Sequence, residues 1–470
     1  MRTVAALEQS DAHIAEVAAY FSQKYALEEQ AKLWSEFRYT HTSPPSQLHL
    51  DDVSGIPFLD NVTGVAQYQL RARVRARDGD IFAATVPDLQ EYEKYNVNIL
   101  NLGQPGFIQA DGGEAPIRVA EACTEGRAFD EIVDAATERG GLTIHPYMGI
   151  ESVYRLAQQL SAVSQVPVSV LAPPPPITWY ANDKVMLHRL VMKLLGDDYV
   201  VDTRIANTAE ELASDIVGLA SHHETVAWKM ARCASAMGNS RFTSAEVRHW
   251  SAAEAVANAK SFLAEKQWVE GDDVLTVAWE TTGCSPSTQL WIPPLGAGEI
   301  RLDGCYEQLL VGPDGMFLGS IPSRLPAAVN LEMAAVSRQV ARVYQQLGYV
   351  GRCSFDFILR DGQLRIVECN GRWGGTSTPM HLVDRLFPRQ RPAYRARDVV
   401  EKSLVGASFG ELQRRIGEAA YNAHTGRGSF ILYNVGPLYA HGKFDVIALG
   451  KTVDEATQAL EVELPSLLQR

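Results

Sequence analysis

The alternation of apolar and polar positions divides the chain into three regions. In the first, over about 60–170, short apolar runs typical of strands alternate with amphipathic segments typical of helices. These segments lie at 97–103, 128–139, 141–147, 151–163 and 166–172. Such alternation predicts an α/β layer with a mostly parallel sheet. The stretch 1–50 spaces large apolar side chains for an amphipathic helix, which we expect to lie against this first domain.

A run of four prolines at 173–176 ends the first region. Such a run is stiff and excludes a helix or a central strand, so it is a good domain boundary. Helices and apolar strands follow as far as Pro392. Beyond it, a predicted helix over 397–420, two short strands and a helix from Val453 form a small α+β tail. We therefore predict domains at 1–176, 177–392 and 393–470.

The stretch 353–379, CSFDFILRDGQLRIVECNGRWGGTSTP, predicts a β-hairpin that ends in a loop. Glu368 and Asn370 are two residues apart and share a face of the second strand. Asp356 joins that face only if it pairs opposite Glu368. A two-residue turn at Asp361 and Gly362 would pair it with the wrong residue, so we predict a three-residue loop, 361–363, with Gly362 left-handed.

This register places two carboxylates and an amide oxygen, from Asp356, Glu368 and Asn370, on one surface. Hard oxygen donors of this kind suit Mg²⁺, which binds them at about 2 Å and shares its shell with substrate phosphates. Arg372 follows two positions later, and its guanidinium can fork onto a phosphate or a developing oxyanion. The alternative is a half-buried strand with scattered polar residues. The four residues taken together favour a metal and phosphate site.

Two lysines earlier in the chain fit the same chemistry. Lys184 lies in the first turn of a helix capped by Asn182 or Asp183, where the helix dipole disfavours a cation unless a phosphate is bound there. Lys229 lies on a short strand that runs into a loop of small residues containing Gly238. Small side chains let backbone amides approach a phosphate, and a lysine on the strand offsets its charge.

The apolar strand 273–280 ends abruptly at Trp279 and Glu280. Free backbone groups at such a strand end can pair with the edge of an adenine, and an acidic residue just beyond can hold ribose hydroxyls. An antiparallel run of strands and a helix over 331–347 then lead to the hairpin. Taken alone, 273–280 is an ordinary core strand.

Composition and charge narrow the functional classes. The chain has 470 residues, 46% hydrophobic and 21% charged, which is typical of a globular protein of two or three domains. Its formal net charge of −13 argues against nucleic acid as the main partner. We expect no membrane contact, because the apolar runs are short and no signal peptide is evident. Six cysteines without paired spacing indicate a cytoplasmic protein with neither disulfides nor zinc.

The order of these elements, over roughly 170–385, resembles an ATP-grasp ligase. The resemblance implies an ATP-grasp fold behind a pre-ATP-grasp α/β domain and before the small α+β domain. It implies that Lys184 and Lys229 bind ATP phosphates, and that 277–280 form the adenine hinge. Asp356, Glu368 and Asn370 would then bind two Mg²⁺ ions, and Arg372 would stabilise the reacting acyl phosphate.

Shorter stretches resemble one branch, the peptide ligases of the pheganomycin pathway. They are NDK at 182–184, SPSTQL at 285–290, EQLLVG at 307–312 and ECNGRWGGTSTP at 368–379. The phosphate loop of that branch is expected to be richer in glycine than ASAMGNS at 234–240, which keeps only Gly238.

The resemblance implies a carboxylate–amine ligase. ATP would phosphorylate a small acid or amino acid, and an amine or peptide acceptor would attack the acyl phosphate to give an amide, ADP and phosphate. Two alternatives remain at this point, a kinase on the same scaffold and a nucleotide-regulated binding protein without turnover. The helical N-terminus and the small tail are candidate surfaces for a homodimer.

Overall fold

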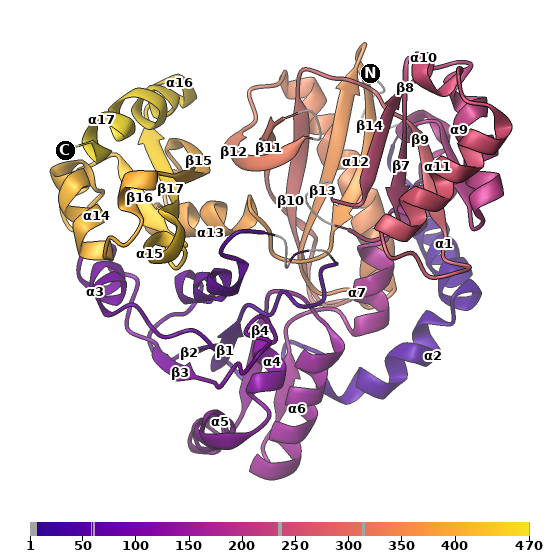
Figure 1. Ribbon diagram of the computed structural model, residues 1–470. Helices are drawn as coiled ribbons and strands as arrows, with labels where there is room; N and C mark the ends of the chain where they lie inside the picture. The colour runs from indigo at the N-terminus through magenta and orange to yellow at the C-terminus, as the bar shows by residue number, and fades with distance from the viewer. Residues whose placement is uncertain (1–6, 58, 60–61, 234–236, 313–314, 470) are drawn as a thin grey trace.

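Three sheets organise the chain in the computed structural model, which describes residues 7–57, 59, 62–233, 237–312 and 315–469 (Figure 1). The N-terminal sheet is parallel throughout, in the order β3-β2-β1-β4-β5. Its strands are β1 (Gln47–Leu50), β2 (Ile81–Ala84), β3 (Gly106–Gln109), β4 (Leu142–Pro146) and β5 (Val168–Val170). Parallel strands need crossover connections. These are supplied by the 3₁₀ segment η4 (Val65–Val74) and by α3 (Gln90–Asn98), α4 (Val119–Ala122), α5 (Gly126–Arg139) and α6 (Glu151–Ser164).

Two expectations for this region were wrong. The run 97–103 is not a strand, because α3 continues to Asn98 and both Asn101 and Gly103 have left-handed backbones, with φ of 53° and 73°. The strand begins instead at Gly106. The first helix, α1 (Asp11–Lys24), does not pack on the N-terminal sheet but shares a core with α8 and α12 of the next region. After it come α2 (Leu27–Ala31) and η2 (Lys32–Phe37), and only η2 contributes Trp34 and Phe37 to the N-terminal core.

A smaller antiparallel sheet follows, in the order β6-β9-β7-β8. Its strands are β6 (Thr203–Ala206), β7 (Thr225–Met230), β8 (Asn239–Thr243) and β9 (Val274–Ala278). The helices of this part of the chain are α7 (Pro175–Ala181), α8 (Lys184–Leu195), η5 (Asp197–Tyr199), α9 (Ala209–Ala220), α10 (Ser244–Val247) and α11 (Ala252–Glu265). Apolar residues of α9 and α11 pack around Trp228 on one face of the sheet and leave its other face to the site.

The proline run does not exclude a helix as expected, because Pro175 and Pro176 are the first two residues of α7. A proline is tolerated in the first helical turn, where its missing N–H has no partner inside the helix.

The largest sheet is antiparallel, in the order β14-β13-β10-β11-β12-β15-β17-β16. Its strands are β10 (Ser285–Ile292), β11 (Arg301–Val311), β12 (Met316–Pro322), β13 (Gly351–Arg360), β14 (Gln363–Asn370), β15 (Ala393–Val400), β16 (Phe430–Tyr433) and β17 (Lys443–Gly450). Two long helices accompany it, α12 (Ala327–Gln346) and α13 (Ser377–Leu386). The pairing of β12 with β15 carries the sheet across residue 392 into the C-terminal region.

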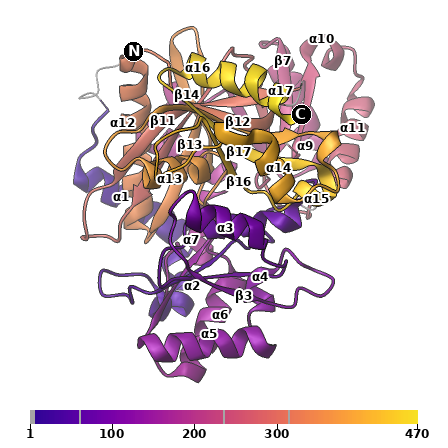
Figure 2. The same ribbon diagram turned by 90° about the vertical axis from the view of Figure 1, so that its left-hand side faces the viewer.

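The C-terminal region adds short helices to these strands: η6 (Lys402–Leu404), α14 (Phe409–Ile416), η7 (Gly417–Ala419), α15 (Leu438–His441), α16 (Val453–Gln458), the π-helical turn Ala459–Glu463 and α17 (Leu464–Leu468). Figure 2 shows this region above α3 of the N-terminal region. The predicted helix over 397–420 is confirmed only in its later part, where α14 lies, because β15 occupies the range as far as Val400 and pairs along its length with β17. No helix among the described residues combines the length and the apolarity needed to cross a membrane.

The hairpin of β13 and β14 confirms the predicted pairing but not the predicted loop. Asp356 lies opposite Glu368, and Ser354 lies opposite Asn370. The turn itself has two residues, Asp361 and Gly362, both left-handed with φ of 51° and 74°. A β-bulge compensates, because Phe357 pairs with Ile366 and the extra residue, Val367, shifts the register by one.

We predict that Gly362→Val lowers the free energy of unfolding by about 1–2 kcal/mol, because an L-residue pays that cost in a left-handed backbone. A Cβ at Gly362 meets no atom within 4 Å, so the loss reports the backbone alone. Urea unfolding measures it, with Asp361→Asn as the control, since asparagine tolerates this conformation. Equal stability of the two variants would contradict the assigned turn.

Candidate functional site

Lys184 joins three parts of the site that are far apart in sequence. Its Nζ lies 2.9 Å from Glu368 Oε1 on β14 and donates to the carbonyl oxygen of Cys233, at 3.2 Å, in the segment that follows β7. The side chain begins at the start of α8, where the N-cap Asp183 accepts hydrogen bonds from two backbone amides. Burial lowers the pKa of Lys184, but contacts with Cys233 and Glu368 outweigh it and raise this pKa. The ammonium group is therefore charged at neutral pH.

A second cationic group lies on the open face of the small sheet. Lys229 on β7 pairs with Asn239 of β8, and Arg241 pairs with Ala227, so these side chains share one face. Lys229 Nζ lies 5.6 Å and the Arg241 guanidinium 5.9 Å from the centre of the Trp279 ring. Burial and the nearby Lys184 lower the pKa of Lys229. Two cations that share this face are suited to an anionic ligand.

The strand end at β9 differs in one respect from the expectation. Val277 is paired on both sides, and the N–H groups of Ala278 and Trp279 donate to the carbonyls of Asp202 and Thr225. The N–H groups of Ala278 and Trp279 are therefore engaged within the sheet and are not available to a ligand. The Glu280 carboxylate forms an ion pair with Arg365 of β14, 2.7 Å away, which ties the small sheet to the hairpin. The Val277 side chain lies in a small apolar cluster with Val185.

The three predicted metal ligands lie together. Asp356 Oδ2 accepts a hydrogen bond of 3.0 Å from Asn370 Nδ2, and Glu368 is directly across the hairpin. Asp356 Oδ1 is buried and makes no hydrogen bond of standard geometry among the described residues, although Gln308 lies close enough to the carboxyl group to lower its pKa. Burial, followed by the charge of Glu368, raises the pKa of Asp356 to about 7. Burial acts the same way on Glu368, but Lys184 and Lys229 outweigh it and lower its pKa.

These donors fit a divalent cation. Two carboxylates face each other at half-buried positions, one of them with a buried oxygen that makes no hydrogen bond of standard geometry among the described residues, and Asn370 leaves its amide oxygen for a ligand. A hard cation would offset the repulsion that raises the pKa of Asp356. Hence Asp356, Glu368 and Asn370 can hold Mg²⁺. No cluster of three or more histidine, cysteine or acidic side chains suited to a metal occurs in the described part of the chain.

Arg372 extends from the loop after β14 toward the N-terminal sheet. Its Nη1 lies 3.5 Å from the hydroxyl of Tyr147, which immediately follows β4, and its guanidinium lies 5.9 Å from the centre of that ring. Asn182 fixes the base of the loop, because its Oδ1 accepts from the N–H of Gly371 at 3.0 Å. The carboxyl ends of parallel strands commonly border ligand sites. The N-terminal sheet thus contributes this edge to the site.

Gly238 closes the segment between β7 and β8. A Cβ at this position would approach Cys233 Sγ within 2.6 Å, so glycine is required for the close packing. Its carbonyl accepts from the N–H of Met230. The predicted small-residue loop includes 234–236, which lie outside the described residues. Sequence reasoning missed Arg241 and Tyr147, since only the pairing of β8 and the position of β4 bring them to the site.

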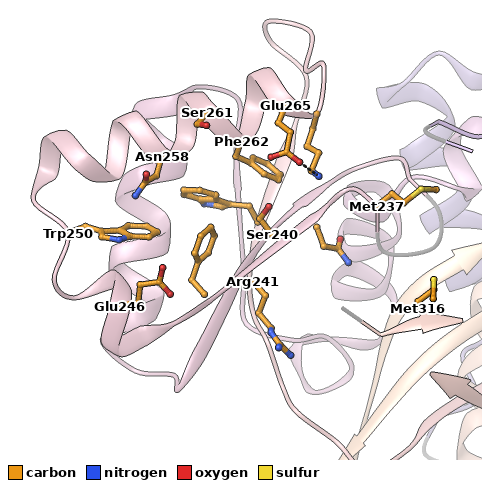
Figure 3. Close-up of a pocket in the computed structure, with 14 residues that line it drawn as sticks. Met237, Ser240, Arg241, Glu246, Trp250, Asn258, Ser261, Phe262, Glu265 and Met316 are labelled. Carbon is orange, nitrogen blue, oxygen red and sulfur yellow. Dashed lines mark hydrogen bonds and ion pairs between the residues drawn. The ribbon is translucent and has the colours of Figure 1, made fainter. Parts of the chain in front are cut away.

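A cavity of about 810 Å³ lies at the edge of the small sheet formed by β8. Figure 3 shows Trp250, Phe262 and Glu246 around it, with Met316 of β12 at its far side. Side chains from both faces of β8 border the cavity, because Asn239 and Arg241 line it together with Ser240 and Phe242. Lys184, Glu368 and Arg372 do not line it.

Comparison with known proteins identifies the architecture. No protein-family profile and no curated protein sequence matches the chain. Among solved structures, an N5-carboxyaminoimidazole ribonucleotide synthetase bound to ADP superposes with a TM-score of 0.52 and 13% identity, over 90% of this chain and 97% of that one. The enzyme from Aspergillus clavatus in complex with ATP superposes with a TM-score of 0.52 and 10% identity, over 90% of this chain and 98% of that one.

A biotin carboxylase domain is a third neighbour. The domain of the Hydrogenobacter thermophilus 2-oxoglutarate carboxylase, bound to MgADP, ADP and bicarbonate, gives a TM-score of 0.52 and 14% identity, over 91% of this chain and 94% of that one. The chain adopts the ATP-grasp fold. The expected fold class is therefore confirmed, including the α/β layer in front and the continuation after it. At such low identity, the shared fold does not assign a reaction.

We predict that Asp356→Asn stabilises the protein above pH 7 when nucleotide and metal are absent. An unfolded aspartate titrates near 3.9, and native Asp356 at about 7. A raised carboxyl pKa means that the native state loses stability as pH rises through this window. The asparagine variant escapes the loss, so its advantage should grow to about 1–3 kcal/mol between pH 4 and 8.

Urea unfolding across this pH range measures the difference. Asp361→Asn is the matched control, because that carboxylate lies on the same hairpin with its side chain 89% exposed. A stability difference between wild type and Asp356→Asn that does not change with pH would contradict the raised pKa.

Proposed function

We propose that the protein is an ATP-dependent carboxylate–amine ligase that forms an amide through an acyl phosphate and releases ADP and phosphate. The observation that carries the proposal is the meeting of Lys184 with Glu368 at 2.9 Å, beside Asp356. A lysine at a helix start, a lysine on a strand and paired carboxylates were inferred from separate stretches, and all belong to one surface. Such a surface suits phosphoryl transfer, which depends on positioning and charge compensation.

In this proposal, cations bind the phosphates and the small sheet binds the base. Lys184 and Lys229 would offset the phosphate charges, with Arg241 as a further cation on the same face. Val277 and Trp279 would border the adenine. Glu280, which directly follows the paired end of β9, would meet the nucleotide edge or the ribose. Gly238 would keep the phosphate loop close to Cys233.

The hairpin and the loop after it would act on the substrate carboxylate. Asp356, Glu368 and Asn370 would hold Mg²⁺, which supplies charge compensation for the transferred phosphoryl group. Arg372 lies where the loop meets Tyr147, and its guanidinium would stabilise the oxyanion formed when an amine attacks the acyl carbon. No side chain stands out as a general base, so the amine would arrive neutral.

The finer assignment rests on the short stretches that resemble peptide ligases of the pheganomycin pathway. They support a peptide ligase that joins a small acid or amino acid to an amine or peptide acceptor, in natural-product biosynthesis. The three domain limits, a cytoplasmic location and a homodimer are part of the same proposal.

An assay of ADP release tests the reaction class. A ligase requires both an acid and an amine for release, a kinase requires one acceptor, and a binding protein releases no ADP. The proposal expects dependence on both substrates and an amide product by mass spectrometry. Release of AMP instead of ADP would overturn the acyl-phosphate route.

We predict that Glu368→Gln or Arg372→Ala lowers kcat by at least about 100-fold, which is typical when a group that stabilises transition-state charge is removed. Circular dichroism should show that the fold is kept, although Glu368→Gln should lower the melting temperature because it leaves the buried Lys184 ammonium without its carboxylate. Arg360→Ala is the control, because Arg360 lies at the far end of the same hairpin with its side chain 43% exposed. A wild-type rate in either site variant would show that the assigned residue has no catalytic role.

We predict that Arg241→Met weakens ADP binding about tenfold, the loss expected for one charge-assisted contact. Isothermal titration calorimetry measures the affinity. Arg204→Met is the matched control, because Arg204 pairs with Thr276 and lies on the opposite face of the same sheet. If both variants bind ADP equally, the cationic face does not bind the nucleotide.

A further inference from the structure

Three oxygen acceptors without partners lie together in the C-terminal part of the large sheet. Asp398 of β15 is directly opposite Asp445 of β17, and Asn434 follows the end of β16. One oxygen of each side chain, Oδ1 in all three, is buried and has no hydrogen-bond partner among the described residues. Like charges directly opposite each other in a sheet are destabilising. Neither the fold nor the proposed nucleotide site explains why the pair is here.

The groups around Asp398 and Asp445 offset the negative charge of one carboxylate better than that of the other. Lys443 Nζ lies 3.0 Å from Asp398 Oδ2 and also donates to the hydroxyl of Tyr68, so it neutralises one of the two acids. Asp445 Oδ2 accepts a hydrogen bond of 2.8 Å from Asn434 Nδ2. Burial, with the charge of Asp398, raises the pKa of Asp445 to about 7 although Arg71 and Lys443 oppose this.

Asn434 supplies an independent sign of a ligand. Its side chain is 1% exposed, and because its Nδ2 is the atom that can donate to Asp445, its Oδ1 is left as an acceptor. A buried polar group without a partner costs roughly 1–3 kcal/mol. Carboxylate and amide oxygens are the acceptors that a primary ammonium group, with its three N–H donors, requires.

A line of contacts connects this place to Arg372. Lys443 touches Tyr68, and the Arg71 guanidinium lies 4.6 Å from the centre of the Tyr68 ring and 5.2 Å from that of Tyr147. Tyr147 is the residue that contacts Arg372. The segment η4 therefore bridges the C-terminal strands, at the left in Figure 1, and the loop that we assign to the reacting carboxylate.

We propose that Asp398, Asp445 and Asn434 form a subsite for a substrate ammonium group remote from the carboxylate being activated, such as the N-terminus of a short peptide or a side-chain amine. The subsite deepens the proposed ligase function and rests on it. The attacking amine must be neutral and must reach the acyl carbon beside Arg372. A cation held between carboxylates beyond Arg71 is therefore a recognition group of the acid substrate and not the nucleophile.

Thallium(I), which is close to ammonium in size, tests the subsite without activity. Crystals of the full chain soaked in thallium(I) acetate should show anomalous density beside Asp445 Oδ1, and methylammonium chloride should displace it. Asp445→Asn should abolish the density, whereas Asp454→Asn, which removes an exposed acid of α16, should not. Absence of density in the wild type, or its persistence in Asp445→Asn, would overturn the proposal.

ADP release provides the second measurement, with L-lysine and common dipeptides as acid probes, each beside its N-acetylated form at the remote amine. Asp445→Asn and Asp398→Asn should lower kcat/KM by about 10- to 100-fold for the free-amine probes and leave the acetylated probes unchanged. Equal use of free and acetylated probes by the wild type would overturn the subsite. Thallium(I) binding without ADP release from any acid and amine would support the subsite and refute the ligase.

Discussion

The contact between Lys184 and Glu368 is the interaction on which the site depends. A buried ammonium and a half-buried carboxylate 2.9 Å apart join the start of α8 to the hairpin, and the same lysine holds the carbonyl of Cys233 after β7. A buried charge without its partner is strongly destabilising. Because Lys184 contacts both Cys233, after β7 of the small sheet, and Glu368, on β14 of the large sheet, it holds these two sheets together at the site. The pair also affects protonation. Lys184 and Lys229 lower the pKa of Glu368, whereas burial and the charge of Glu368 raise the pKa of Asp356 to about 7 although Arg372 opposes this.

In the hairpin, a two-residue turn and a β-bulge together place the site residues on one surface. Left-handed backbones at Asp361 and Gly362 favour a two-residue turn, which alone would send Asp356 to the apolar face. The bulge at Val367 restores the register beyond it. Bulges are found next to active sites because they re-aim a side chain. Here the bulge allows a tight turn and a carboxylate pair on the same hairpin.

The sequence was sufficient for the hairpin pairing, the start of α8 and the strand that carries Lys229, because each depends on local periodicity and capping. The sequence was insufficient where tertiary contacts determine the secondary structure or the position of a side chain. The bulge at Val367 has no local signal, and 393–400 becomes a strand through its pairing with β17. Arg241 and Tyr147 reach the site only through sheet pairing and domain packing, so no motif could reveal them. The ATP-grasp fold was predictable because several ordered elements had to agree at once.

The central claim is that the carboxylates of the hairpin and the cations of the small sheet form one nucleotide site that includes a metal. Calorimetric titration of ADP into the protein, with and without Mg²⁺, tests it most directly. The account predicts that ADP binds with one site per chain and that Mg²⁺ strengthens the binding, because the cation offsets repulsion between the phosphates, Asp356 and Glu368. ADP binding that is absent, or unaffected by Mg²⁺, would contradict the account.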